Sequence, residues 1–138
     1  MAQVKICGLR EAAHVDAAIQ AGAQYLGFVF FPKSSRAVSP EQAAALMTDV
    51  PMGVAKVGLF VDPSDDLLRD TLAQAALDII QLHGKETPQR VLDVKQRYGL
   101  PVMKAFAVST PDDLVRIALY RGVADRFLFD AKPPKGSQ

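Results

Sequence analysis

The sequence predicts an α/β protein built around a parallel sheet that is covered on both faces. Three observations support this prediction. Short apolar runs alternate strictly with longer segments of helical spacing, the runs recur about every 20–30 residues, and most intervening segments open with a helix-capping residue. Such alternation is typical of consecutive βαβ units, in which each helix carries the chain back to start the next parallel strand.

Six apolar runs are predicted as strands. They are VKIC (4–7), YLGFVF (25–30), AKVGLF (55–60), DIIQL (78–82), PVMKAF (101–106) and RFLF (126–129). Five helices are predicted between them, and four have clear starts at Ser39, Ser64, Thr87 and Thr110. Each start combines a capping side chain with an early proline or acidic residue, which suits the unpaired amides and the dipole of a helix N-terminus.

Two architectures are compatible with this pattern, an open doubly wound sheet and a (β/α)8 barrel. No G-x-G-x-x-G follows the first strand, which removes one support for a dinucleotide-binding open sheet. Six strands are too few for the barrel, and the sequence ends where a sixth helix should begin. The residues alone leave both architectures open.

Composition favours a single globular domain over residues 1–138. The chain is 49 % apolar and 22 % charged, with a formal net charge of +1 and interspersed signs, so it shows no electrostatic footprint for nucleic acid or membrane. No apolar run approaches the roughly 18–20 residues that span a bilayer. Cys7 is the single cysteine, which excludes an intrachain disulfide and a thiolate metal cluster. We therefore expect a cytoplasmic protein without nucleic-acid or membrane partners.

Polar side chains follow several of the predicted strands. Because ligands bind at the carboxyl ends of parallel strands, these residues are expected to converge on one rim. They are Cys7, Arg36, Gln81, His83 and Asp130. Lys5 precedes Cys7 by two residues, as Gln81 precedes His83, so each pair shares a strand face. An inward lysine needs a partner, and its ammonium would favour the thiolate of Cys7.

Each of these residues also has an ordinary structural interpretation. A lone cysteine after an apolar strand is usually a small buried hydrophobe. Asp130 could form a turn, Arg36 could be a solvated loop charge, and His83 could pack on a helix. The expected convergence of these side chains is therefore stronger evidence for a site than any one residue.

Five segments carry a resemblance to a known family. They are KICGLR (5–10), GFVFFPKSSRAVSP (27–40), KVGLFVD (56–62), IIQLHG (79–84) and FLFDAKPPKGSQ (127–138). In this order they closely resemble the phosphoribosylanthranilate isomerases of tryptophan biosynthesis. The resemblance implies a (β/α)8 TIM barrel, of which residues 1–138 hold strands 1–6 and five helices. Strands 7 and 8 with their helices would be absent, so we expect a C-terminally truncated barrel.

The resemblance also implies an activity, the Amadori rearrangement of N-(5′-phosphoribosyl)anthranilate to an aminoketose by general acid–base catalysis. Cys7 matches the general base, Asp130 the general acid, and Arg36 the residue that holds the anthranilate carboxylate. Gln81, His83 and Lys5 are expected to line the substrate pocket. The chemistry requires no cofactor and no metal, and the partner is a small phosphorylated substrate. The full-length enzyme is expected to be a monomer or homodimer.

Two alternatives remain open. Another barrel that acts on a phosphorylated anthranilate derivative, such as indole-glycerol-phosphate synthase, would carry catalytic lysines and glutamates at its strand ends. A protein of a different class would be an inactive, open piece of a barrel that self-associates through the edges of its sheet.

Overall fold

The computed structural model describes residues 3–131, with the side chains of residues 3–129. The strands are β1 (Lys5–Ile6), β2 (Tyr25–Val29), β3 (Ala55–Phe60), β4 (Ile79–Leu82), β5 (Val102–Val108) and β6 (Arg126–Ala131). The helices are α1 (Ala12–Gln20), α2 (Pro40–Met47), α3 (Asp65–Gln74), α4 (Pro88–Tyr98) and α5 (Pro111–Ala118). Within the described residues the predicted alternation of six strands and five helices is confirmed.

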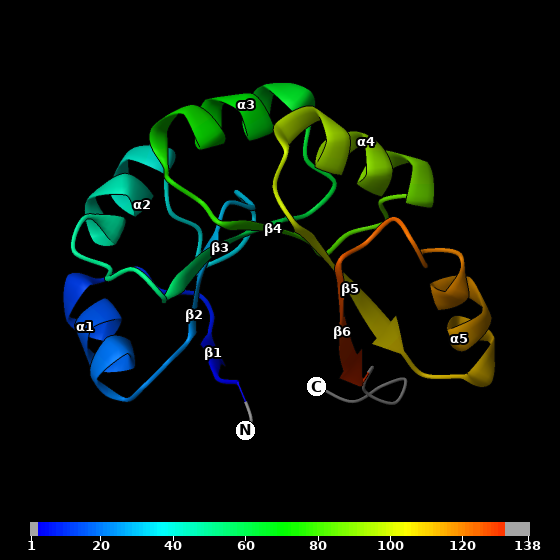
Figure 1. The fold of residues 1–138 in the computed structure, drawn as a ribbon, viewed down its shortest axis with the longest axis horizontal. Helices are drawn as coiled ribbons and strands as arrows, with labels where there is room; N and C mark the ends of the chain where they lie inside the picture. Colours follow the sequence, from blue (N-terminus) through cyan, green and yellow to red (C-terminus); the bar gives the residue numbers. More distant parts are fainter. Residues whose placement is uncertain (1–2, 132–138) are drawn as a thin grey trace.

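The strands form one parallel sheet in the order β1-β2-β3-β4-β5-β6. A doubly wound sheet would reverse its strand order at a switch point, whereas here every strand pairs with the next one along the chain. Figure 1 shows the sheet curled into an arc, with the helices following one another around its convex side and with β1 and β6 at the two ends of the arc. Sequential pairing of parallel strands in a curled sheet is the arrangement found in a barrel, and here it extends over six strands.

Helix starts agree closely with the sequence. The side-chain oxygens of Ser39, Ser64 and Thr87 each accept a hydrogen bond, at 3.1 Å, from the backbone N–H three residues further on. Helix α4 ends at the residue before Gly99, which has a left-handed backbone. Each cap satisfies an amide that the helix itself leaves without a partner.

Only β3 keeps both predicted bounds; β2 and β4 are each one residue shorter than predicted, β5 is shifted to Val102–Val108, and the differences at β1 and β6 bear on the site. Strand β1 ends at Ile6, because the N–H groups of Gly8 and Leu9 both turn to the carbonyl of Gly27, at 3.0 and 3.2 Å. Strand β6 continues through Ala131, because β5 extends to Val108 and supplies it with partners. The prediction that the strand stops at residue 129 is therefore wrong, and Asp130 lies inside β6, in register with Ala107.

The two faces of the sheet differ in how they are covered. On the convex face, side chains of the strands pack against the helices in a large core that includes Leu26, Phe28, Phe60, Ile80 and Leu82, each fully buried. A smaller buried cluster lies on the concave face and consists of Tyr25, Val57, Ile79 and Met103. Apolar side chains on both faces explain why the strands read as continuous apolar runs.

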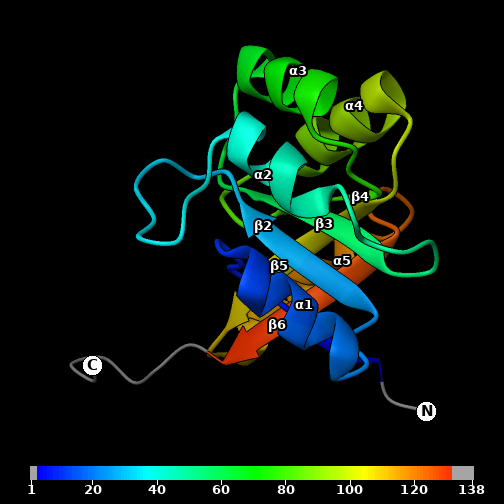
Figure 2. The ribbon, with the colours of Figure 1, turned by 90° about the vertical axis from the view of Figure 1, so that its left-hand side faces the viewer.

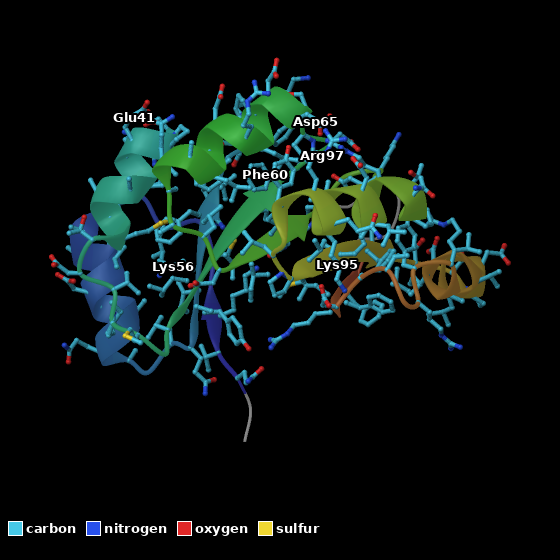
Figure 3. The ribbon with its side chains drawn as sticks, turned by 45° about the horizontal axis from the view of Figure 1, so that its top comes forward. Glu41, Lys56, Phe60, Asp65, Lys95 and Arg97 are labelled. Carbon is cyan, nitrogen blue, oxygen red and sulfur yellow. The ribbon has the colours of Figure 1, made fainter. Side chains whose placement is uncertain are left out.

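Ion pairs join neighbouring helices on the outer surface. Asp65 at the start of α3 accepts from Arg90 of α4 at 2.8 Å. It also accepts from Arg97 of α4 at 2.9 Å, and Figure 3 labels Asp65 and Arg97. The hydrogen bond from Arg90 is the main reason why the pKa of Asp65 lies below its ordinary value. Exposed pairs of this kind add little to stability. In residues 3–131, none of the helices has the length and apolar character needed to cross a membrane.

Candidate active site

Cys7 lies at the carboxyl end of β1, beside a position on β2 that only glycine can occupy. A Cβ added at Gly27 would stand 2.9 Å from the sulfur of Cys7 and 3.1 Å from its Cα. Contacts this short require the neighbour to move, and a backbone atom moves at high cost. The bare backbone of Gly27 therefore allows Cys7 to sit at the rim, where its side chain is partly exposed.

Arg36 reaches the same place from the loop between β2 and α2, the loop that projects from the sheet in Figure 2. The loop is anchored at three points: the hydroxyl of Ser34 accepts from the N–H of Arg36 at 3.1 Å, Arg10 donates to the carbonyl of Ser35 at 2.7 Å, and Val38 donates to the carbonyl of Val29 at 2.9 Å. These contacts fix the backbone that carries the guanidinium.

The side chain of Arg36 lies over Gly8, the residue that follows Cys7. A Cβ at Gly8 would stand 2.5 Å from Cδ of Arg36. The backbone φ of Gly8 is 81°, a value that residues other than glycine rarely adopt. Gly8 therefore brings the guanidinium of Arg36 close to the thiol of Cys7.

Cys7, Arg36 and His83 line one pocket of about 300 Å³ at the carboxyl ends of β1 to β4. The other lining residues are Val29, Phe31, Ser34, Ser35, Leu59 and Val61. None of these described lining residues is acidic, so Arg36 gives the pocket positive charge. Such a pocket suits an anionic group placed next to a thiol.

Gln81 and Lys5 lie behind the pocket on the concave face of the sheet. Lys5 donates to Oε1 of Gln81, and Nε2 of Gln81 lies 3.2 Å from Nδ1 of His83. Gln81 is 1 % exposed. The structure thus links all three of these expected residues, although only His83 reaches the pocket of Cys7 and Arg36.

Asp130 completes the set of expected residues, and its side chain lies outside the part of the chain that the structure describes. Its backbone lies in β6, where every second residue shares a face, so Asp130 is on the same face of the strand as Arg126 and Leu128. Leu128 packs against the concave cluster, and Arg126 donates to the hydroxyl of Tyr25 across the concave face. The role expected for Asp130 remains a prediction.

The loops after β3 and β4 are held by a buried ion pair that was not predicted from the sequence. Nζ of Lys104 donates to Oε1 of Glu86 at 2.8 Å and to the carbonyl of Gly84 at 2.7 Å. Glu86 also accepts from the backbone N–H of Asp62 at 2.7 Å and from that of Gly84 at 2.9 Å. Both carboxylate oxygens of Glu86 therefore accept hydrogen bonds.

Tyr120 closes this network from the end of α5, donating its hydroxyl to the carbonyl of Glu86 at 2.5 Å. Burial, and then the negative charge of Glu86, raise the pKa of Tyr120. A signal for the network was present in the sequence, because Lys104 interrupts the apolar run PVMKAF in the same way that Lys5 interrupts VKIC. A lysine inside a buried strand requires a partner of opposite charge or a strong acceptor.

Comparison with known proteins identifies the family. The family model described as N-(5′-phosphoribosyl)anthranilate (PRA) isomerase matches residues 4–138. The N-(5′-phosphoribosyl)anthranilate isomerase of Paracoccus denitrificans is 62 % identical over 132 residues, which are 96 % of this chain and 61 % of that protein. The chain therefore spans about three fifths of the length of this curated relative.

Solved structures agree. The phosphoribosyl anthranilate isomerase of Thermotoga maritima superposes with a TM-score of 0.90 at 35 % identity, over 100 % of this chain and 66 % of that one. A phosphoribosyl anthranilate isomerase in complex with reduced 1-(o-carboxyphenylamino)-1-deoxyribulose 5-phosphate gives a TM-score of 0.88 at 34 % identity, over 96 % of this chain and 66 % of that one. By its sequence along residues 4–138 and by its fold, this chain belongs to the N-(5′-phosphoribosyl)anthranilate isomerase family.

Proposed function

We propose that this chain carries the acid, the base and the carboxylate clamp of an N-(5′-phosphoribosyl)anthranilate isomerase. The pocket in which Cys7 and Arg36 lie side by side is the observation that carries the proposal. Membership of the family supports it, as does the solved relative that binds a reduced aminoketose phosphate. A thiol beside a fixed guanidinium matches a substrate in which a reacting sugar is attached to an anthranilate carboxylate.

The proposed reaction is an internal redox isomerisation of an aminoaldose to an aminoketose. A general acid gives a proton to the furanose ring oxygen, the bond from that oxygen to C1′ breaks, and a protonated imine forms. A general base then removes the proton from C2′ to give an enolamine, which tautomerises to the ketone. C1′ is reduced as C2′ is oxidised, so the balance needs no external oxidant or reductant.

The proposal assigns the base to Cys7, the acid to Asp130 and the carboxylate contact to Arg36. Each positioned proton transfer is worth roughly 10²–10⁴-fold in rate. Asp130 would have to keep its proton near neutral pH, which requires burial or a nearby negative charge. In the alternation of β6 it follows Arg126 and Leu128, whose side chains face the concave side on which the substrate would lie.

We further propose that residues 1–138 form one domain, the first six units of a (β/α)8 barrel. The match leaves about one third to two fifths of the length of these relatives uncovered, enough chain for the remaining strands and helices. In barrels of this type a phosphate commonly sits on the loops after strands 7 and 8. The phosphate of the substrate would therefore be held by segments that correspond to the unmatched part of the relatives, whereas the proton transfers would take place on residues 1–138.

The test is a kinetic comparison of three variants in the longest natural form of the protein. Cys7→Ala and Asp130→Asn should each lower kcat by about 10²–10⁴-fold with little change in substrate affinity, because each removes one proton-transfer group. Arg36→Ala should mainly raise KM, because it removes a charge that binds the carboxylate in ground state and transition state alike. Turnover is measured by the loss of the aminoaldose.

Lys33→Ala is the matched control for Arg36→Ala, since it removes an exposed cation from the same loop without touching the pocket. Its KM should be unchanged. Near-normal turnover in Cys7→Ala would refute the assignment of the base. Absence of turnover in the unmodified protein, combined with a defined oligomer in light scattering, would instead favour the alternative of a non-catalytic piece that associates through its open sheet edges.

A further inference from the structure

Three side chains on the concave face form a connected chain that leads into the pocket. Lys5 on β1 donates to Oε1 of Gln81 on β4, and Nε2 of Gln81 is 3.2 Å from Nδ1 of His83. Gln81 and His83 are two residues apart along the strand direction, so both side chains lie on the same face. His83 then lines the pocket that holds Cys7 and Arg36.

Lys5 determines which atoms donate and which accept along this series of hydrogen bonds. An ammonium group has three donors and no acceptor, so the atom of Gln81 next to Lys5 must be the amide oxygen. The other end of the amide is an NH₂ group, which can only donate. Nδ1 of His83 must therefore accept, which it can do only without a proton.

A neutral imidazole carries one proton, and with Nδ1 as the acceptor that proton is on Nε2. We infer that Lys5, acting through Gln81, holds His83 as the neutral Nε2–H tautomer and so makes it a hydrogen-bond donor to an acceptor oxygen of the ligand in the Cys7–Arg36 pocket. In this arrangement Lys5 and Gln81 are positioning residues, and His83 is the group that contacts the ligand.

The reversed arrangement is costly. Turning the amide of Gln81 by 180° would place its NH₂ group against the ammonium of Lys5 and its oxygen against His83. Two donors would then face each other, and the amide of Gln81, which is 1 % exposed, would lose its hydrogen bond to Lys5. A buried polar group without its partner is strongly disfavoured, so the orientation of Gln81 transmits the charge of Lys5 to the tautomer of His83.

This inference rests on the proposed function for the identity of the ligand and has two chemical consequences there. A protonated Nε2 cannot take the proton of Cys7, so the site is not a Cys–His pair in which the imidazole activates the thiol. A donor beside Arg36 instead matches an acceptor such as a carboxylate or hydroxyl oxygen. The substrate of the proposed isomerase carries both groups.

The experiment reads the tautomer directly, by ¹⁵N NMR of the histidine side chains at about pH 8, above the ordinary histidine pKa of about 6.5. His83 in the unmodified protein should show a protonated Nε2 and an unprotonated Nδ1. Gln81→Glu keeps the size of the side chain but presents acceptor oxygens at both ends. The proton should then move to Nδ1, or the ring should become doubly protonated, while Lys5 keeps an acceptor.

His14 is the internal control. It is the other histidine of the chain, lies on α1 and pairs with Glu11 at 3.4 Å, so its signals should not change in Gln81→Glu. Signals of His14 and the spectral dispersion also report whether a variant is folded. If Gln81→Glu does not fold, Lys5→Met provides the test, because the amide of Gln81 is then free to turn and both tautomers of His83 should be populated.

A protonated Nδ1 in the unmodified protein would overturn the inference, and so would a tautomer that is the same in Gln81→Glu and Lys5→Met as in the unmodified chain. None of these readings requires substrate, so they stand apart from the success of the proposed function. In an active enzyme, Gln81→Glu should also raise KM roughly 10–100-fold, the effect of one lost hydrogen bond to a charged group. Gln89→Glu, which adds the same charge at an exposed position of α4, should leave KM unchanged.

Discussion

Lys5 and Lys104 both lie inside strands of the sheet, but they face opposite sides of it. Lys104 on β5 faces the convex side, is 2 % exposed and forms an ion pair with Glu86. Lys5 on β1 faces the concave side, is partly exposed and donates to the neutral amide of Gln81. Lys104 belongs to a buried network that holds two loops, whereas Lys5 begins a series of hydrogen bonds that ends at the pocket.

The difference shows how one sheet separates stability from chemistry. On the convex face, a buried charge is tolerated because a carboxylate and a carbonyl surround it and the helices cover it. On the concave face, the polar side chains cross the open interior and reach the rim at which Cys7 and Arg36 lie. Changes on the two faces should therefore have different consequences.

The largest expected effect is on stability and comes from breaking the buried ion pair. Lys104→Met leaves the carboxylate of Glu86 buried without its cation, which should cost about 3–5 kcal/mol of unfolding free energy. The double variant Lys104→Met/Glu86→Gln should lose less than the sum of the single variants, because no buried charge then remains unpaired. Urea denaturation measures all three values.

Substitutions of two other lysines provide comparisons for the loss of stability in Lys104→Met. Lys95→Met breaks a pair with Asp125 whose side chains are 38 % and 32 % exposed, and should cost no more than about 1 kcal/mol. Lys5→Met should also cost less than Lys104→Met, with its main effect on the tautomer of His83. A loss below about 1 kcal/mol in Lys104→Met would mean that the loops do not depend on the pair.

Substitutions of two glycines, one on each face of the sheet, should have different effects on turnover. Gly27→Ala places a methyl group against the sulfur and Cα of Cys7 on the concave side, at 2.9 and 3.1 Å. It should displace the thiol and lower turnover about 100-fold in the proposed isomerase, since a shift of about 1 Å can have that effect. Gly58→Ala instead meets Leu77 Cδ1 and Phe60 Cε2 on the convex side, at 2.5 and 3.1 Å.

Gly58→Ala should therefore cost about 1–3 kcal/mol of stability, the usual effect of overpacking a core, and leave turnover near normal. Measuring kcat and unfolding free energy for both variants decides the matter. Equal losses of turnover in the two variants would show that the faces are not functionally distinct.

Much of the fold could be predicted from the sequence because its signals are local. Ser39, Ser64 and Thr87 each stand directly before the helix that they cap. The alternation of apolar runs and helices can likewise be recognised from neighbouring residues in the sequence. The convergence of Cys7, Arg36 and His83 could be expected as well, because the carboxyl ends of parallel strands meet at one rim.

What was missed depends on contacts between distant residues. The extension of β6 to Ala131 depends on the length of β5, and nothing within RFLF indicates it. The partner of Lys104 is a glutamate in a loop, 18 residues away, and its identity follows only from the way the loops fold over β5. The orientation of Gln81 likewise requires knowledge of both of its neighbours, Lys5 and His83.

The smallest expected effect concerns a carboxylate that resembles Glu86 in its bonding but lies at the surface. Asp113 at the start of α5 accepts from the N–H groups of Ser109 and Thr110, at 2.8 and 3.0 Å, and from Arg116 at 2.8 Å. The backbone hydrogen bonds, led by that of Ser109, hold its pKa well below the ordinary value of about 4.

A lowered pKa in the folded state means that Asp113 stabilises the fold above about pH 4, and that this contribution is lost as the pH falls from there toward the lower folded value. Asp113→Asn should therefore be less stable than the unmodified chain at pH 7, and the difference should shrink by about pH 3. Asp112→Asn is the control, because the neighbouring carboxylate accepts no hydrogen bond from the described residues. A stability difference for Asp113→Asn that is constant between these pH values would show that the negative charge of Asp113 does not stabilise the start of α5. In that case charge would matter for the buried carboxylate of Glu86 but not for the carboxylate of Asp113 at the surface.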